Sequence, residues 1–306
     1  MTGATQGTST RSNPFLEARS RSSVLRGSGA ALKPGSVALV GVPSDENSSF
    51  LRGAALAPCR IREFLDSGAM NLCAENGVDL AAEGRFHDLG DLDLAQGTSM
   101  VHQVEGSFAD LLQRCAHVLA LGGDHSVTYP IVKAFGKKHP GLNILHLDAH
   151  PDLYDEFEGN RYSHACPFAR IMEEGLVVRL VQVGIRTMNP HQRAQALRFG
   201  VEVLELRDWR PDVPLEFGGP VYISLDLDVL DPAYAPGVSH PEPGGMSTRD
   251  AIRLIQNVRA PIVGADIVEL NPTRDPVGIT SAVAAKLLKE IAARLLETEA
   301  SAPGAA

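Results

Sequence analysis

Short apolar runs recur along the chain from about residue 37, and stretches with a helical period of apolar residues separate them. The runs are apolar throughout and do not alternate with polar residues, which is typical of parallel strands covered by helices on both faces. We expect strands at 37–42, 118–121, 143–147, 179–183, 201–204, 221–225 and 262–267. We expect helices at 54–66, 100–117, 128–138, 167–174, 190–199, 248–258 and 281–296.

Two of the expected helices carry a recognisable start. Ser247 and Thr248 precede Asp250 and a set of apolar positions, and Pro190 stands where a first helical turn tolerates proline. The alternation of strands and helices without an internal repeat predicts one α/β domain over residues 37–300. Its expected architecture is a three-layer α/β/α arrangement around a doubly wound, mainly parallel sheet.

The two ends of the chain differ from this domain. Residues 1–36 are rich in Ser, Gly, Thr and Arg, which predicts a flexible N-terminal extension, and residues 301–306 form a short tail. A mitochondrial-type transit peptide has a similar composition, so a targeting role for the extension remains an alternative.

Composition narrows the class of partner. Hydrophobic residues make up 44% of the chain and charged residues 21%, as in ordinary soluble domains. The net charge is −9 and there is no run of Lys or Arg, so we expect no nucleic-acid partner. The longest apolar runs have the length of a strand, so we expect no membrane span. The four cysteines are scattered, which fits a reducing compartment and predicts a cytoplasmic protein, or an organelle matrix if residues 1–36 are a transit peptide.

Side chains that bind metals follow three of the expected strands. Ligands in such a sheet bind beyond the carboxyl ends of the strands, so the residues just after each strand matter most. In chain order the candidate ligands are His125, Asp148, His150, Asp152, Asp226 and Asp228. Residues two apart in an extended chain point to the same side, so the Asp-x-His-x-Asp and Asp-x-Asp spacings aim their ligands at one place. Carboxylates this close repel one another unless cations are present, and we therefore predict a site for divalent ions.

The ligand types bear on which metal is bound and which carboxylates take part. Oxygen ligands with two imidazoles and no thiolate suit Mn²⁺, with Ni²⁺, Co²⁺ or iron as alternatives, and disfavour a structural zinc. A single Asp-x-Asp is usually a turn or a cap. We accordingly assign structural roles to Asp124, in the Gly-Gly turn, and to Asp231, before Pro232.

The same residues carry a family resemblance. Segments 122–126, 148–152 and 224–232 resemble the three signature segments of the arginase/agmatinase (ureohydrolase) family. The likeness extends through shorter segments at 47–53, 162–165, 183–186, 235–240 and 268–272. Within the family the chain is most similar to plant-type arginases and related bacterial agmatinase-like proteins. The resemblance implies hydrolysis of a guanidino compound to urea and an amine, best matched by L-arginine giving L-ornithine and urea. Agmatine (an agmatinase giving putrescine and urea), guanidinobutyrate and free guanidine remain alternative substrates.

The resemblance also assigns the ligands to two ions, most closely matched by two Mn²⁺. One ion would be held by His125, Asp148, Asp152 and Asp226. The second would be held by Asp148, His150, Asp226 and Asp228, so that Asp148 and Asp226 bridge. Two ions would lower the pKa of a shared water molecule enough to make it a nucleophile at neutral pH.

Further roles follow from the resemblance. Glu269 matches the carboxylate that pairs with the guanidinium, and His164 matches a loop histidine that passes protons to the leaving amine. Taken alone, His164 would be interpreted as a surface or packing residue. Asn160 and Arg161 are candidates to bind a substrate carboxylate. Asn189 stands where animal-type arginases place an acidic residue for the α-amino group, a departure that weakens the assignment of arginine.

Two other classes of protein are alternatives to the hydrolase. Single-zinc deacetylases share this type of sheet but use fewer carboxylates, and a non-catalytic regulatory subunit would be expected to have lost ligands. The full set of four carboxylates and two imidazoles favours the hydrolase. Family members are commonly trimers or hexamers, so we expect a homo-oligomer that binds a small guanidino substrate.

Overall fold

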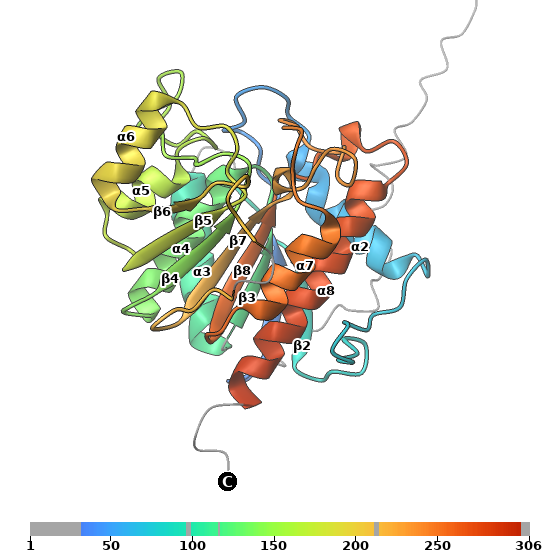
Figure 1. The fold of residues 1–306 in the computed structure, drawn as a ribbon. Helices are drawn as coiled ribbons and strands as arrows, with labels where there is room; N and C mark the ends of the chain where they lie inside the picture. The colour runs from blue at the N-terminus through green and yellow to red at the C-terminus, as the bar shows by residue number, and fades with distance from the viewer. Residues whose placement is uncertain (1–31, 96–98, 116, 211–213, 301–306) are drawn as a thin grey trace, which may run out of the picture.

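The computed structural model describes residues 32–95, 99–115, 117–210 and 214–300. In these ranges eight strands form one sheet in the order β2-β1-β3-β8-β7-β4-β5-β6 (Figure 1). The strands are β1 (Val37–Gly41), β2 (Phe86–Asp91), β3 (His117–Leu121), β4 (Asn143–Leu147), β5 (Arg179–Val183), β6 (Glu202–Leu204), β7 (Val221–Asp226) and β8 (Ile262–Val268). All neighbouring strands pair in parallel, so every carboxyl end lies at the same edge of the sheet.

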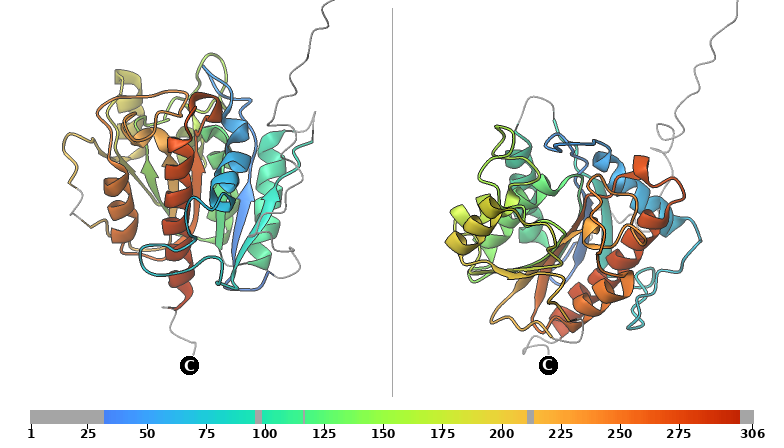
Figure 2. Two further views of the ribbon diagram at one scale, coloured as in Figure 1. Left: turned by 90° about the vertical axis from the view of Figure 1, so that its right-hand side faces the viewer. Right: turned by 45° about the horizontal axis from the view of Figure 1, so that its top comes forward.

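Helices cover both faces of the sheet, which confirms the predicted three-layer α/β/α fold (Figure 2). One layer contains α2 (Ala57–Asp66), α7 (Thr248–Asn257) and α8 (Ile279–Ala300). The other contains α3 (Met100–Arg114), α4 (Thr128–Lys138), α5 (Pro167–Glu173) and α6 (Pro190–Phe199).

Successive residues of the strands supply these two layers in turn. Leu39 of β1 lies in the core beneath α2 and α8, whereas its neighbour Val40 lies in the core beneath α3 and α4. The inner strands are buried on both faces, which is why they read as unbroken apolar runs. Each fully buried side chain of this size contributes about 1.5–3 kcal/mol relative to an exposed one. The sheet is therefore a rigid support for the residues at its edge.

The helix starts follow their sequence signals. Ser247 and Asp250 form a capping box at the start of α7, and Pro190 lies in the first turn of α6. Two of the differences from the expected boundaries change the type of element. The first turn of the helix expected at 54–66 is a 3₁₀ turn (Ala54–Leu56), and α3 ends at Arg114, so that His117 begins β3.

The expected strands did not include residues 86–91, where β2 forms the edge of the sheet. Its sequence, Phe-His-Asp-Leu-Gly-Asp, lacks an apolar run. Charge pairing helps to hold it in place: the buried Arg62 guanidinium pairs with Asp88 at 2.8 Å and also with Asp91. A strand held in this way has no periodic apolar signal.

Residues 1–31 and 301–306, which include most of the predicted extension and the predicted tail, lie outside the described residues. Residues 33–36 form a turn in which the Lys33 backbone N–H donates to Ser36 Oγ at 3.1 Å. All four cysteines lie within the described ranges and none forms a disulfide. None of the described helices combines the length and the apolar character needed to cross a membrane.

Candidate metal centre

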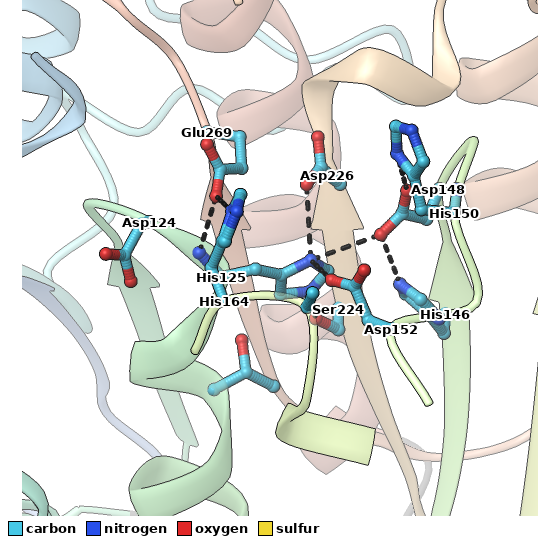
Figure 3. Close-up of polar contacts among 12 residues, drawn as sticks. Asp124, His125, His146, Asp148, His150, Asp152, His164, Ser224, Asp226 and Glu269 are labelled. Carbon is cyan, nitrogen blue, oxygen red and sulfur yellow. Dashed lines mark hydrogen bonds and ion pairs between the residues drawn. The ribbon is translucent and has the colours of Figure 1, made fainter. Parts of the chain in front are cut away.

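The six predicted ligands meet at the carboxyl ends of three strands, and Figure 3 labels all of them except Asp228. His125 begins the 3₁₀ turn after β3, the segment 148–152 follows β4, and Asp226 ends β7 two residues before Asp228. Five of the six ligands are buried, and His150 is partly exposed. The sheet edge thus brings together residues that lie more than a hundred positions apart in the sequence.

The first group of ligand atoms surrounds His125. Its Nδ1 lies 3.1 Å from Asp148 Oδ2, 3.1 Å from Asp152 Oδ2 and 3.2 Å from Asp226 Oδ2. This nitrogen is buried and makes no hydrogen bond. Atoms that coordinate one divalent ion at about 2.1 Å lie roughly 3 Å from one another. Three carboxylate oxygens therefore converge on one imidazole nitrogen. Potential ligand atoms that all lie within 4.8 Å of one another form two groups in the described residues, His125 with His146 and Asp148, and Asp148 with His150 and Asp228.

The second group surrounds His150. Its Nδ1 lies 3.0 Å from Asp228 Oδ2 and 3.4 Å from Asp148 Oδ1. Asp148 therefore directs one carboxylate oxygen to each group, which is the arrangement of a bridging ligand. Asp226 differs, because its Oδ2 faces His125 while its Oδ1 accepts the Asp228 N–H at 2.8 Å.

Electrostatics at this edge favour bound cations. Burial, with the charges of Asp228 and Asp148, raises the pKa of Asp226 well above its ordinary value. Burial and Asp148 likewise raise the pKa of Asp228 to about 6. Buried carboxylates that oppose one another's ionisation are stabilised as anions when divalent ions lie between them. The donor set and the geometry both fit two such ions.

A chain of hydrogen bonds behind His125 sets its tautomer. Ser224 Oγ donates to Asp266 Oδ1 at 2.8 Å, so it accepts from His125 Nε2–H at 3.0 Å. His125 Nδ1 then carries its lone pair toward the three carboxylates, as a metal ligand requires.

The backbone around the centre is under local constraint. Asp152 and Glu269 have positive φ angles of 50° and 64°, which are uncommon outside glycine and cluster at functional sites. Gly123 is needed for a close approach, because a Cβ there would lie 1.7 Å from the Ser44 carbonyl oxygen. The bare backbone lets the Asp124 N–H donate to that oxygen at 2.9 Å.

Two carboxylates take the structural roles predicted for them. Asp124 accepts N–H groups from Ser126 and Asn47, each at 3.0 Å, and so holds the turn that presents His125. Asp231 accepts three backbone N–H groups in the loop after β7. Neither carboxylate belongs to the two groups of ligand atoms.

A third histidine at the centre was missed by the sequence reasoning. His146, within β4, is fully buried, and its Nε2–H donates to Asp148 Oδ2 at 2.8 Å. Gln182 Nε2 donates to its Nδ1 at 3.0 Å, and its ring stacks on Phe168. Burial lowers the pKa of His146, so the ring is neutral and orients the bridging carboxylate. Its position two residues before Asp148, in the same alternation, was an available signal.

Glu269 and His164 form a pair beside the ligands (Figure 3). Glu269 Oε1 accepts the backbone N–H of His125 at 2.8 Å and lies 2.9 Å from His164 Nδ1. Its other oxygen, Oε2, is buried and has no hydrogen-bond partner. Burial lowers the pKa of His164, but the charge of Glu269 outweighs this and raises the pKa to about 9. His164 Nε2 lies 2.8 Å from Ser49 Oγ, a contact that was not anticipated. The free Oε2 is an acceptor suited to a cationic N–H donor.

The three residues predicted to bind the substrate tail have partners within the protein. The Asn160 amide donates to Asn47 Oδ1 at 3.0 Å. The exposed Arg161 pairs with Glu173 at 2.9 Å. Asn189 is the N-cap of α6. In this respect they differ from Glu269, which keeps an unpartnered buried oxygen.

His240 is a further residue of the site that was not singled out. It closes the 235–240 segment, and its ring centroid lies 5.0 Å from that of His164 and 6.4 Å from that of His150. Burial lowers the pKa of His240, which favours a neutral ring.

Comparison with known proteins extends this description. Residues 35–293 match the model of the arginase family. "Arginase 1, mitochondrial" of Arabidopsis thaliana is 48% identical over 277 residues, covering 85% of this chain and 81% of the relative. "Guanidino acid hydrolase, mitochondrial" of Homo sapiens is 36% identical, covering 83% and 76%. The solved structure of the arginase from Medicago truncatula is 43% identical with a TM-score of 0.81, covering 86% of this chain and 88% of that one.

Proposed function

This chain belongs to the arginase family, and on that premise we propose that it hydrolyses L-arginine to L-ornithine and urea with two divalent metal ions. The observation that carries the proposal is the placement of Asp148, whose two oxygens face two separate groups of ligand atoms. A single ion would need only one of these groups.

The ions would be held by the residues assigned above, His125 with three carboxylates and His150 with Asp148, Asp226 and Asp228. We propose Mn²⁺ as the bound metal, because the ligands are mostly carboxylate oxygens. When bound, two such ions would lower the pKa of a shared water molecule and so supply a nucleophile at neutral pH.

Glu269 orients the substrate in this proposal. The guanidinium is planar and donates N–H groups in pairs, and Glu269 Oε2 is a buried acceptor with no other partner. Binding there places the central carbon of the guanidinium beside the ligand groups, since Glu269 Oε1 also accepts the backbone N–H of His125.

His164 supplies the proton for the leaving group. Its Nδ1 faces the same side as Glu269, and its pKa of about 9 keeps the ring charged at neutral pH. As the carbon–nitrogen bond breaks, the Nδ1 proton passes to the leaving amine, which would otherwise depart as an unstable anion.

Arginine is favoured among guanidino compounds because a plant relative named an arginase is 48% identical to this chain, whereas the human guanidino acid hydrolase is 36% identical. In this proposal Asn160 and Arg161 bind the α-carboxylate of arginine, and Asn189 binds its α-ammonium. Agmatine, guanidinobutyrate and free guanidine form the second candidate class. The similarity to a human guanidino acid hydrolase gives that class its support. A single-zinc deacetylase is disfavoured by the second group around His150.

Assembly and location are part of the same proposal. We infer a homo-oligomer, a trimer or hexamer, that acts in the cytoplasm, or in an organelle matrix if residues 1–36 are a targeting segment. The names of the plant relatives include mitochondrial proteins. Light scattering after gel filtration measures the assembly, and fluorescent fusions with and without residues 1–36 measure the location.

Urea release tests the proposed reaction. The enzyme, loaded with Mn²⁺ or with Ni²⁺, is supplied with arginine, agmatine, guanidinobutyrate and guanidine in parallel. The proposal predicts release from arginine with the highest kcat/KM. Turnover of another compound with arginine ignored would overturn the substrate but keep the reaction, and no release from any of the four would overturn both.

A further inference from the structure

The loop between β1 and the 3₁₀ turn at Ala54–Leu56 lies against His164. Ser49 Oγ is 2.8 Å from His164 Nε2, and the Asn47 carbonyl accepts the His164 backbone N–H at 3.1 Å. His164 is therefore held at both ring nitrogens, by Ser49 on one side and by Glu269 on the other.

Substrate binding affects the contact of His164 with Glu269 and its contact with Ser49 differently. In the function proposed above, Glu269 binds the guanidinium, so the substrate competes with His164 for that carboxylate. Ser49 has no such competitor. When the contact with Glu269 weakens, the hydroxyl of Ser49 is the contact that keeps the imidazole in its orientation.

The loop is itself fixed to the segment that carries the metal ligand His125. The Asn47 N–H donates to Asp124 Oδ2 at 3.0 Å, and the Asn47 side-chain amide donates to Ser126 Oγ at 3.1 Å. These hydrogen bonds fix the position of Ser49, and through it that of His164, relative to the metal centre.

We propose that Ser49 is a positioning residue for His164, an assignment that rests on the proposed hydrolase function. In the charged ring, Nε2–H donates to Ser49 Oγ and Nδ1–H points to the site. Once the Nδ1 proton has passed to the leaving amine, Nε2 keeps its proton and its hydrogen bond. Nδ1 is then left with a free lone pair, which takes up the next proton. Ser49 thereby confines proton transfer to the inner nitrogen.

Matched serine variants test this assignment. Ser49→Ala removes the hydroxyl that contacts His164, and Ser49→Thr retains one. Ser48→Ala is the control, because Ser48 is the adjacent serine of the same loop and its Oγ donates to Asp124 instead, at 3.3 Å. We expect Ser49→Ala to lower kcat about tenfold, the rate equivalent of one lost hydrogen bond, with KM nearly unchanged. Ser49→Thr restores most of the rate, and Ser48→Ala stays within about twofold of the wild type.

Two further readouts separate positioning from general damage. The acid form of His164 is the active one, so activity falls as the pH rises through its pKa. Loss of an acceptor for Nε2–H moves that fall to lower pH in Ser49→Ala but not in Ser48→Ala. In a His164→Ala background, Ser49→Ala should cause no further loss, since residues that act through one another are not additive.

The outcomes are distinguishable from a failure of the proposed function. Equal kcat in Ser49→Ala and Ser48→Ala, or a full additional loss in the His164→Ala background, overturns the role of Ser49. If the wild type releases no urea, crystal structures of the metal-loaded wild type and Ser49→Ala still decide the question. The assignment requires the His164 ring to rotate or lose its order when the hydroxyl is absent, and an unchanged ring overturns it.

Discussion

The edge of the sheet that carries the six predicted ligands and the loop rim that carries Asn160, Arg161 and Asn189 satisfy their polar groups in different ways. At the sheet edge, the buried His125 Nδ1 has no hydrogen-bond partner, and carboxylate oxygens of Asp148 and Asp152 each lie 3.1 Å from it. On the rim, the three side chains already have partners of their own. The sheet edge is arranged for an added ligand, whereas the rim is complete without one. We conclude that the chemistry is built into the strands, and that the choice of substrate rests on loops that must exchange partners to take part.

The largest effect is expected from a substitution of Asp226, at the sheet edge. Asp226→Asn removes a charge that faces His125, so bound metal and activity should fall together, with a loss of kcat of roughly 10³-fold or more. Metal analysis and urea release measure the two effects. Asp231→Asn, in the same segment but bonded only to backbone N–H groups, is the matched control and should keep its metals. Full metal content and normal turnover in Asp226→Asn would contradict its assignment as a ligand.

His164→Asn probes the group that joins the two regions. Removing a general acid should lower kcat by about 10²-fold while both ions and the KM are retained. The exposed His191, which pairs with Asp155, provides a control when changed to Asn. The pH–rate profile is the decisive measurement: His164→Asn should lose the fall in activity at high pH, and an unaltered profile with normal kcat would remove His164 from the mechanism.

Asn160→Ala tests whether the rim contacts the substrate at all. If its amide leaves Asn47 to bind the α-carboxylate, the preference for arginine over agmatine should narrow by about tenfold or more, the value of a charge-assisted hydrogen bond. Values of kcat/KM for the two substrates give the ratio. A uniform loss on both substrates with the ratio unchanged would mean that Asn160 only holds its loop.

The smallest expected effect is on stability, and it concerns the sheet edge without its ions. Burial raises the pKa of Asp228 from 3.8 to about 6, so its contribution to stability is present below the lower value and is lost as the pH rises through the higher one. The metal-free protein should therefore lose stability over that range, while the ions reverse the loss by binding the ionised form. Thermal melts between about pH 4.5 and 7.5 should show a metal-dependent gain in Tm that grows with pH, by about 2–4 °C for each kcal/mol. A gain that is constant with pH would contradict this.

The same division explains what the sequence could predict. The ligands follow buried strands whose apolar runs are unmistakable, so their meeting point followed from parallel pairing alone. The edge strand β2 could not be found, because pairing between Arg62 and Asp88 takes the place of an apolar pattern. Ser49 was hidden for a related reason. Its contact with His164 joins two loops 115 positions apart, and no periodicity specifies such a contact.

The number of metal ions bound per chain tests the central claim most directly. The purified protein is stripped with a chelator, loaded with Mn²⁺, freed of excess ion and analysed for metal and protein together. The two groups of ligand atoms that share Asp148 predict close to two ions per chain. A value near one would contradict a binuclear centre and favour the single-ion class, and a value near zero would contradict a metal centre at this edge of the sheet.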